Sequence, residues 1–231
     1  MNVSTKLEIY QQLKTIYDDF AGTLSVACEK KCATCCTRNV ILTGLEGFEI
    51  ISHLESIKQL DLLDRLRDEA SKRRFQPGIT TNGLAELCMN GEDPPEEESE
   101  VAWGQCPLLI DDMCSIYESR PFECRCFISE NDCRQLGSAD MDPYVVTVNN
   151  VFRQFLEHVD QTGICGNLTD VLLFLADSDQ RELYQKGQLK PEGSLITNLP
   201  LQMLLIPPEY QEKIQPIISS IQGIRVGLGQ Q

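Results

Sequence analysis

The sequence has few basic residues and no long apolar run. Of its 231 residues, 20 are Lys or Arg against 35 Asp or Glu, and the formal net charge is −15. Nucleic acids and anionic membranes bind clustered Lys and Arg, so this charge argues against both as partners. No stretch approaches the roughly 18 apolar residues of a membrane-spanning helix. The charge is compatible with a basic or neutral protein, or with a small ligand, as the partner.

The start of the chain also lacks the features of an export signal. Its first residues, MNVSTKLEIYQQLKTIYDDF, carry charges throughout, with no apolar run of about 7–15 residues. We therefore expect a cytoplasmic location, where thiols are kept reduced. Because 11 cysteines is an odd number, and because the compartment is reducing, the clustered cysteines point to metal or redox chemistry and not to disulfides.

Hydrophobic periodicity predicts a mostly α-helical protein. Apolar residues recur at three- and four-residue steps over residues 5–27, which predicts an amphipathic helix. Thr43 and Glu46 have the spacing of a capping box and predict the start of the next helix, which continues to residue 57. Further helices are predicted over residues 59–75, 144–160, 168–186 and 208–222.

The remaining segments complete a single α-rich domain with one small β-hairpin. Two short apolar runs around Asp111 and Asp112 predict the hairpin, over residues 106–117. The acidic stretch 92–100 reads as a solvated loop and the tail 223–231 as frayed. We expect one domain over residues 1–231, with a cysteine-rich metal-binding region at 28–135 and a helical C-terminal part at 143–231.

Nine of the cysteines fall into two dense groups. The first is Cys28, Cys32, Cys35 and Cys36, and the second is Cys106, Cys114, Cys124, Cys126 and Cys133. Thiolates are soft ligands that select zinc or iron–sulfur clusters over magnesium or calcium. The only histidines, His53 and His158, lie in predicted helices away from both groups, so zinc held by two cysteines and two histidines is disfavoured. Basic residues that favour the thiolate form flank both groups: Lys30, Lys31, Arg38, Arg120, Arg125 and Arg134.

The spacing leaves the kind of metal centre open. The adjacent pair Cys35-Cys36 cannot easily turn both side chains onto one tetrahedral ion, which favours either a second metal or a polynuclear iron–sulfur cluster over a single zinc. Cys28-x3-Cys32-x2-Cys35 also has the cysteine spacing of radical-SAM enzymes. The sequence after it does not show the alternating strands and helices of the βα barrel in which that motif occurs. Whether the protein is an enzyme stays open: as a redox enzyme or methyltransferase accessory, its site candidates are Tyr117, Arg120 and Arg125.

The two cysteine groups together resemble a known family. The segments CEKKCATCC and CPLLIDDMCSIYESRPFECRCF resemble the YkgJ-type cysteine-cluster family, a zinc- or iron-chelating domain with a CxxCxxCC-like motif. The steps Cys106-Pro-Leu-Leu, Cys114-Ser-Ile-Tyr and Arg120-Pro121 before Cys124-Arg125 are similar to its pattern C-P-[FL]-L … C-x-I-Y-x-x-R-P-x-x-C-R. The likeness covers about residues 28–135, and a related cluster occurs in flagellin lysine methylases.

The resemblance implies a metal-chelating protein that holds iron, as an iron–sulfur cluster, or zinc. The ligands that it implies are Cys28, Cys32, Cys35, Cys36, Cys106, Cys114, Cys124 and Cys133. This chain has one extra residue between Cys28 and Cys32, and Cys126 is an alternative to Cys124 or Cys133. It has no glycine-rich nucleotide loop to support methyl transfer. We expect the two groups to converge on one metal centre that holds the domain together.

Overall fold

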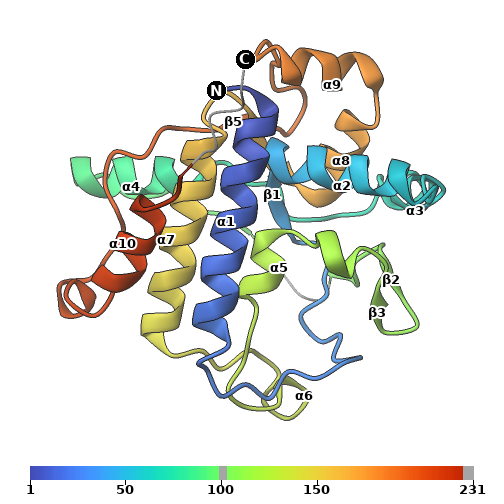
Figure 1. The fold of residues 1–231 in the computed structure, drawn as a ribbon. Coiled ribbons are helices and arrows are strands. Elements are labelled where there is room, and N and C mark those ends of the chain that lie inside the picture. Colours follow the sequence, from blue (N-terminus) through green and yellow to red (C-terminus); the bar gives the residue numbers. More distant parts are fainter. Residues whose placement is uncertain (99–102, 226–231) are drawn as a thin grey trace.

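Helices dominate the computed structural model, which describes residues 1–98 and 103–225 (Figure 1). The chain is about 48% helical, so the mostly α expectation is confirmed. The helices of the described residues are α1 (Val3–Ala21), α2 (Gly44–Ser56), α3 (Leu62–Glu69), α4 (Thr81–Asn90), α5 (Phe122–Cys126), α6 (Cys133–Leu136), α7 (Pro143–Val159), α8 (Leu168–Leu175), α9 (Ser178–Gln185) and α10 (Gln215–Gln222). The short 3₁₀ helices η2 (Tyr117–Ser119) and η3 (Pro208–Tyr210) precede α5 and α10.

Within residues 1–98 and 103–225 the strands form two small antiparallel sheets. β1 (Ile41–Thr43), β4 (Ile164–Asn167) and β5 (Ile196–Thr197) make a three-stranded sheet in the order β1–β4–β5, which the sequence did not predict. β2 (Leu109–Ile110) and β3 (Met113–Cys114) form the predicted hairpin. Asp111 and Asp112 both have positive φ, +49° and +60°. This is the backbone of a tight hairpin turn whose twist matches the flanking strands, and Asp tolerates it better than most residues.

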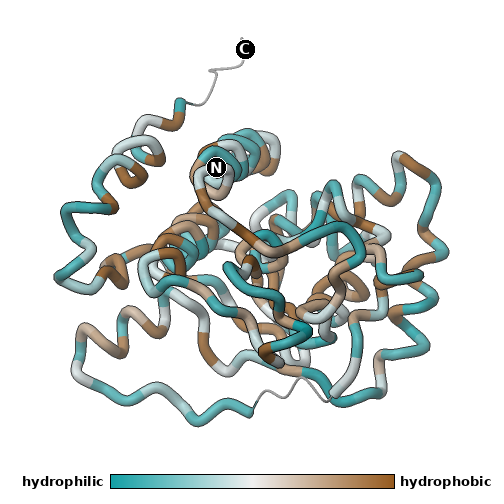
Figure 2. The backbone as a smooth tube through the Cα atoms, turned by 90° about the horizontal axis from the view of Figure 1, so that it is seen from below, coloured by the Kyte–Doolittle hydropathy of each residue, from teal (hydrophilic) through white to brown (hydrophobic). Residues whose placement is uncertain are grey.

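The core is built around α1 and α7, which run side by side through the middle of the molecule (Figure 1). Their apolar faces meet at Tyr17 and Phe152, whose ring centroids are 5.2 Å apart. The buried Tyr17 hydroxyl donates to Oδ1 of Asn149 at 2.8 Å, which satisfies its polar atom inside the core. Polar and apolar residues alternate along the helices, as Figure 2 shows. The apolar residues of most helices join one cluster.

A buried carboxylate, Asp160, joins four parts of the chain at the end of α7. It accepts hydrogen bonds from Lys6 Nζ of α1 (2.9 Å) and Tyr184 Oη of α9 (2.7 Å). The backbone N–H of Leu45 in α2 (2.9 Å) and the side-chain amide of Asn198 (3.1 Å) donate to its other oxygen. A buried charge is tolerated when it is paired and hydrogen-bonded, so this network holds α1, α2, α7 and α9 in register.

Several predicted helices are shorter than the periodicity indicated. The first ends at Ala21 instead of residue 27, because Gly22 closes it and Ala27 N donates to Ser129 O of a distant loop. The helix predicted over 59–75 is confined to α3. The one predicted over 168–186 is two helices, since the Asp177 side chain caps Asp179 N and starts α9. The last is split into η3 and α10.

The remaining predictions concern two helix starts, the acidic stretch and the C-terminal tail. α7 and the capping box at the start of α2 are confirmed. α4 was missed, although the Thr80 side chain caps it by accepting from Gly83 N. Residues 92–98 of the acidic stretch are exposed coil, and residues 99–100 lie outside the described residues, as does the tail from residue 226 onward. Within the described ranges no helix has both the length and the apolar character to cross a membrane.

Candidate metal centre

The two cysteine-rich segments lie side by side. Cys106 N donates to Cys36 O at 2.9 Å, and Arg38 N donates to Gly104 O at 3.0 Å. Between these bonds Thr37 and Gln105 form an isolated antiparallel bridge. The backbone at the end of the first cysteine group is therefore held against the backbone at the start of the second, although the two are far apart in the chain.

The hairpin and α5 add two more thiols beside this contact. Cys114 pairs with Leu109 in the β2–β3 hairpin, and Leu109 N in turn donates to Cys106 O at 3.1 Å. Cys124 lies on α5. The side chains of Cys106, Cys114 and Cys124 are all partly buried and pack against the apolar core. These local structures deliver three thiols of the second group to one region.

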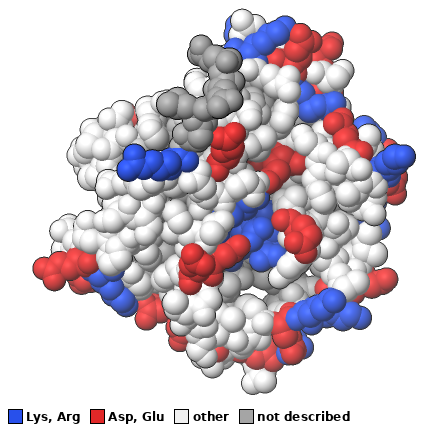
Figure 3. Space-filling model, viewed as in Figure 1, with Lys and Arg blue, Asp and Glu red and all other residues white. Residues whose placement is uncertain are grey.

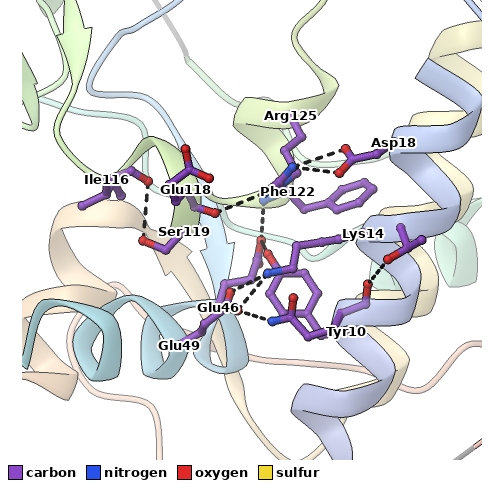
Figure 4. Close-up of polar contacts among 12 residues, drawn as sticks. Tyr10, Lys14, Asp18, Glu46, Glu49, Ile116, Glu118, Ser119, Phe122 and Arg125 are labelled. Atoms are coloured by element: carbon purple, nitrogen blue, oxygen red, sulfur yellow. Dashed lines mark hydrogen bonds and ion pairs between the residues drawn. The ribbon is translucent and has the colours of Figure 1, made fainter. Parts of the chain in front are cut away.

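Figure 4 shows how polar contacts hold α5 in place. Phe122 N, in the first turn of α5, donates to Oε1 of the buried Glu46 at 2.7 Å. The same carboxylate forms the capping box of α2 through its other oxygen. At the other end of α5, Arg125 contacts Asp18 of α1 at 3.3 Å and donates to Glu118 O at 3.3 Å. The helix that carries Cys124 is thus fixed to both α1 and α2.

Cys35, Cys36, Cys106, Cys114 and Cys124 influence one another electrostatically, and we call them the five-cysteine group. A hydrogen bond from Cys35 lowers the pKa of Cys36, while its burial and the thiols of Cys106, Cys114 and Cys124 act in the opposite direction. Burial raises the pKa of Cys124, and Cys106, Cys114 and Cys35 raise it further. Effects of this kind weaken with distance, so these five cysteines lie in the same part of the molecule.

Cys28, Cys32 and Cys133 gather separately, and we call them the three-cysteine group. Ala27 N donates to Ser129 O at 2.8 Å, and Glu29 pairs with Arg134 at 3.0 Å, so the residues next to Cys28 contact the segment around Cys133. Burial raises the pKa of Cys28, and the thiols of Cys133, Cys32 and Cys35 raise it as well. Cys35 therefore lies between the two groups.

The remaining cysteines belong elsewhere. Cys126 is 5% exposed and forms part of the apolar core, and its carbonyl accepts from Asn149 Nδ2 at 3.1 Å. Two residues apart on a helix, Cys124 and Cys126 point in different directions, and Cys126 is the more deeply buried of the two. Cys165 is buried on β4, and Cys88 is exposed on α4. Of the histidines, His53 lies on α2 and His158 on α7.

The flanking cations do not all have the same role. Burial raises the pKa of Cys106 to about 11, and the charge of Arg38 opposes this rise. The Arg38 side chain is 9% exposed and pairs with Glu69 at 2.8 Å, while its Nε has no partner among the described atoms. Arg120 opposes the rise that burial causes in the pKa of Cys114. Lys30 and Lys31 are exposed, and Figure 3 shows basic and acidic side chains interspersed on the face drawn.

The residues considered for the enzyme alternatives make contacts with neighbouring elements of the fold. Tyr117 is largely exposed and Arg120 stacks on its ring at 3.9 Å, while Arg125 anchors α5. Every strand pair in residues 1–98 and 103–225 is antiparallel. The radical-SAM motif follows the first strand of a parallel βα barrel, so this fold does not favour that alternative.

The donor chemistry suits a soft metal, but the side chains are not already arranged around one. Across the described part of the chain, no three or more His, Cys, Asp or Glu side chains have the geometry of a metal site. The five-cysteine group supplies only sulfur donors, next to two arginines, and such a shell fits zinc or iron–sulfur and not a hard cation. Its residues therefore fit the expected metal in their chemistry, whereas the described side chains do not have the geometry of a metal site.

Comparisons with family models, with curated proteins and with solved structures each find no match to this chain. The resemblance to the YkgJ-type family thus stands on the two cysteine segments alone.

Proposed function

We propose that this protein binds a thiophilic metal, as an iron–sulfur cluster or as zinc, through the five-cysteine group. The observation that carries the proposal is the Cys106 N to Cys36 O hydrogen bond, which holds the two cysteine segments together. The similarity of both segments to the YkgJ-type pattern supports it independently.

In this proposal the chain supplies the ligands and the charge that balances them. Thiols bind metal as thiolates, and burial alone disfavours that charged form at Cys106, Cys114 and Cys124. The guanidinium groups of Arg38 and Arg120 offset this effect. The bound metal would act as a tie between the segment that follows α1, the β2–β3 hairpin and α5. Metal binding and folding then share free energy.

The test is elemental analysis of the full chain purified without oxygen, comparing wild type with Cys106→Ala, Cys124→Ala and the control Cys165→Ala. We expect the first two variants to lose most of the metal and to unfold at lower urea concentration. Cys165→Ala removes a buried thiol from the core and should keep its metal. A brown, reducible protein identifies iron–sulfur, and a colourless zinc protein identifies the other option. Equal metal content in all four proteins, or none in the wild type, refutes the proposal.

A further inference from the structure

We infer that the cleft between α5 and α7 binds a small α-amino acid such as alanine, with the ligand's carboxylate on Arg153 and its ammonium group on Glu123. Both residues line this cleft. Its described lining includes no member of the five-cysteine group, so the inference goes beyond the proposed metal binding and does not depend on it.

The cleft has a buried floor and a partly exposed mouth. Residues of β1, α2, α4, α5, α7 and β4 line it. The side chains of Glu123 and Arg153 are 16% and 28% exposed and lie at the mouth. The floor includes buried residues from four different elements, which are Leu42, Phe122, Leu156 and Cys165. A ligand would therefore meet charged groups first and apolar groups behind them.

The two charged groups at the mouth have hydrogen-bonding capacity that the fold does not use. Arg153 Nη2 and Glu123 Oε1 are 3.9 Å apart, which is beyond the range of a hydrogen bond. Glu123 Oε2 accepts from Ile41 N. Within residues 1–98 and 103–225 the Arg153 guanidinium donates no hydrogen bond, and Glu123 Oε1 accepts none. A cationic donor and an anionic acceptor are thus both available at one opening.

The charge of the cleft favours a zwitterion over a simple ion. Two further carboxylates line it, and both are already held by the backbone: Glu46 accepts from Phe122 N at 2.7 Å (Figure 4), and Glu157 accepts from Asn82 N at 2.8 Å. Three carboxylates against one guanidinium repel a free anion. A simple cation would leave Arg153 without a hydrogen-bond partner, whereas a zwitterion supplies a partner to each group at the mouth.

An α-amino acid also matches the spacing of these groups. Its ammonium and carboxylate are attached to the same carbon atom, so both can reach Arg153 Nη2 and Glu123 Oε1 across the 3.9 Å that separates them. The planar guanidinium offers several N–H donors and suits a carboxylate. A zwitterion with widely separated charges would need the two side chains to move apart.

The space behind the mouth selects a small ligand side chain. The cavity is about 30 Å³, and roughly 10–15 Å³ is needed to hold one water molecule. It therefore admits about two water-sized groups, which fits the methyl group of alanine but not the branched side chain of leucine. The floor at Leu42, Phe122 and Leu156 is apolar, so a methyl group is preferred there to a polar group of the same size.

The experiment is calorimetric titration of the reduced full-length chain, purified without oxygen, with L-alanine, L-leucine, acetate and ethylamine. Acetate and ethylamine each carry one of the two charges of alanine. The variants are Arg153→Met and Glu123→Gln, and the control is Arg67→Met, which removes an exposed arginine that pairs with Asp64. Glu123→Gln keeps an acceptor for Ile41 N, so it tests the charge with little disturbance of α5.

We expect one equivalent of alanine to bind, at least tenfold more tightly than the other three compounds. Arg153→Met and Glu123→Gln should each weaken alanine binding about tenfold or more, as expected for the loss of one charge-assisted hydrogen bond. Arg67→Met should leave it unchanged. The inference is overturned if alanine does not bind to the wild type, if it binds no more tightly than acetate or ethylamine, or if Glu123→Gln keeps full affinity.

A second variant tests the size of the cavity independently of its charges. Cys165→Ala removes a sulfur atom from the floor and makes room for a longer ligand side chain. The affinity for L-2-aminobutyrate relative to alanine should then rise about fourfold, the value of one additional buried methylene. An unchanged ratio means that the ligand side chain does not enter this cavity, which contradicts the inference. The metal content of the same samples reports separately on the proposed function.

Discussion

Replacing Lys6 by Met tests the Asp160 network, because it removes the only cation from a fully buried ion pair. The side chains of Lys6 and Asp160 are 5% and 0% exposed, and their charged atoms are 2.9 Å apart. Removing one partner of a buried pair lowers the free energy of unfolding by about 3–5 kcal/mol. Hydrogen bonds from Tyr184, Leu45 and Asn198 to Asp160 remain in the variant, so we expect a loss at the lower end of this range, about 3 kcal/mol. Urea denaturation followed by circular dichroism measures it.

The pKa of Asp160 predicts how the destabilisation by Lys6→Met changes with pH. Burial raises the pKa of Asp160, and the Lys6 charge opposes this rise, so the pKa rises further in the variant. A carboxyl whose folded-state pKa exceeds its unfolded value of about 3.9 binds more protons when folded. The stability it contributes is therefore present at low pH and lost as pH rises through the folded-state pKa. The destabilisation by Lys6→Met should be largest near neutral pH and smaller in mildly acidic solution.

The matched control is Lys14→Met, two turns further along α1. Lys14 pairs with Glu49 at 2.8 Å, but the side chains are 9% and 18% exposed. Water that reaches this pair screens it, so we expect a loss of about 1 kcal/mol. If Lys6→Met destabilises the protein no more than Lys14→Met does, or if its effect grows as the pH is lowered, the assignment of Asp160 as a buried, paired carboxylate is wrong.

Two further predictions concern the candidate metal centre. In the reduced, metal-free chain Cys36 should be alkylated at lower pH than Cys106, because a hydrogen bond from the preceding thiol lowers the pKa of Cys36 and burial raises that of Cys106 to about 11. Peptide mass spectrometry after timed alkylation at several pH values measures which cysteine reacts first. Alkylation of Cys106 at lower pH than Cys36 would contradict the prediction. Gly104 has φ +115°, and an added Cβ would lie 2.9 Å from the Arg38 guanidinium. Gly104→Ala should thus lower the free energy of unfolding by about 1–3 kcal/mol in urea titrations, more than Gly91→Ala, whose Cβ meets nothing within 4 Å.

Local signals in the sequence predicted the parts of the fold that local physics determines. The helix over α7 and the capping box of Thr43 and Glu46 depend on residues within a few positions of one another. The hairpin of β2 and β3 depends on a two-residue turn. All the residues that determine such an element lie within the element itself, so a short stretch of sequence is enough to predict it.

The parts that were missed depend on distant partners or on weak signals. β1 pairs with β4, for instance Leu42 with Gly166, and strands this short show no alternation of their own. The break between α8 and α9 was visible in Asp177, which can cap a helix, but continuous periodicity concealed it. The cap at Thr80 was an available signal for α4.

The same distinction applies to the candidate site. Spacing alone identified the two cysteine groups, but not how their members divide between the five-cysteine and three-cysteine groups. That division depends on contacts such as Ala27 with Ser129, which no short pattern encodes. The spacing of the cysteines also could not predict the position of Cys126, because its direction depends on the short helix α5 and on the core beneath that helix.

The five-residue helix α5 serves the apolar core and the candidate site at once. Phe122 and Cys126 are buried in the aromatic interior, with the Phe122 ring stacked on Phe152, while Cys124 belongs to the five-cysteine group. Because these residues share one five-residue helix and a close-packed interior transmits strain, repacking around Phe122 or Cys126 would also shift the Cys124 thiol. Volume changes deep in the protein would thereby alter the positions of sulfur atoms in the candidate site without any direct contact with it.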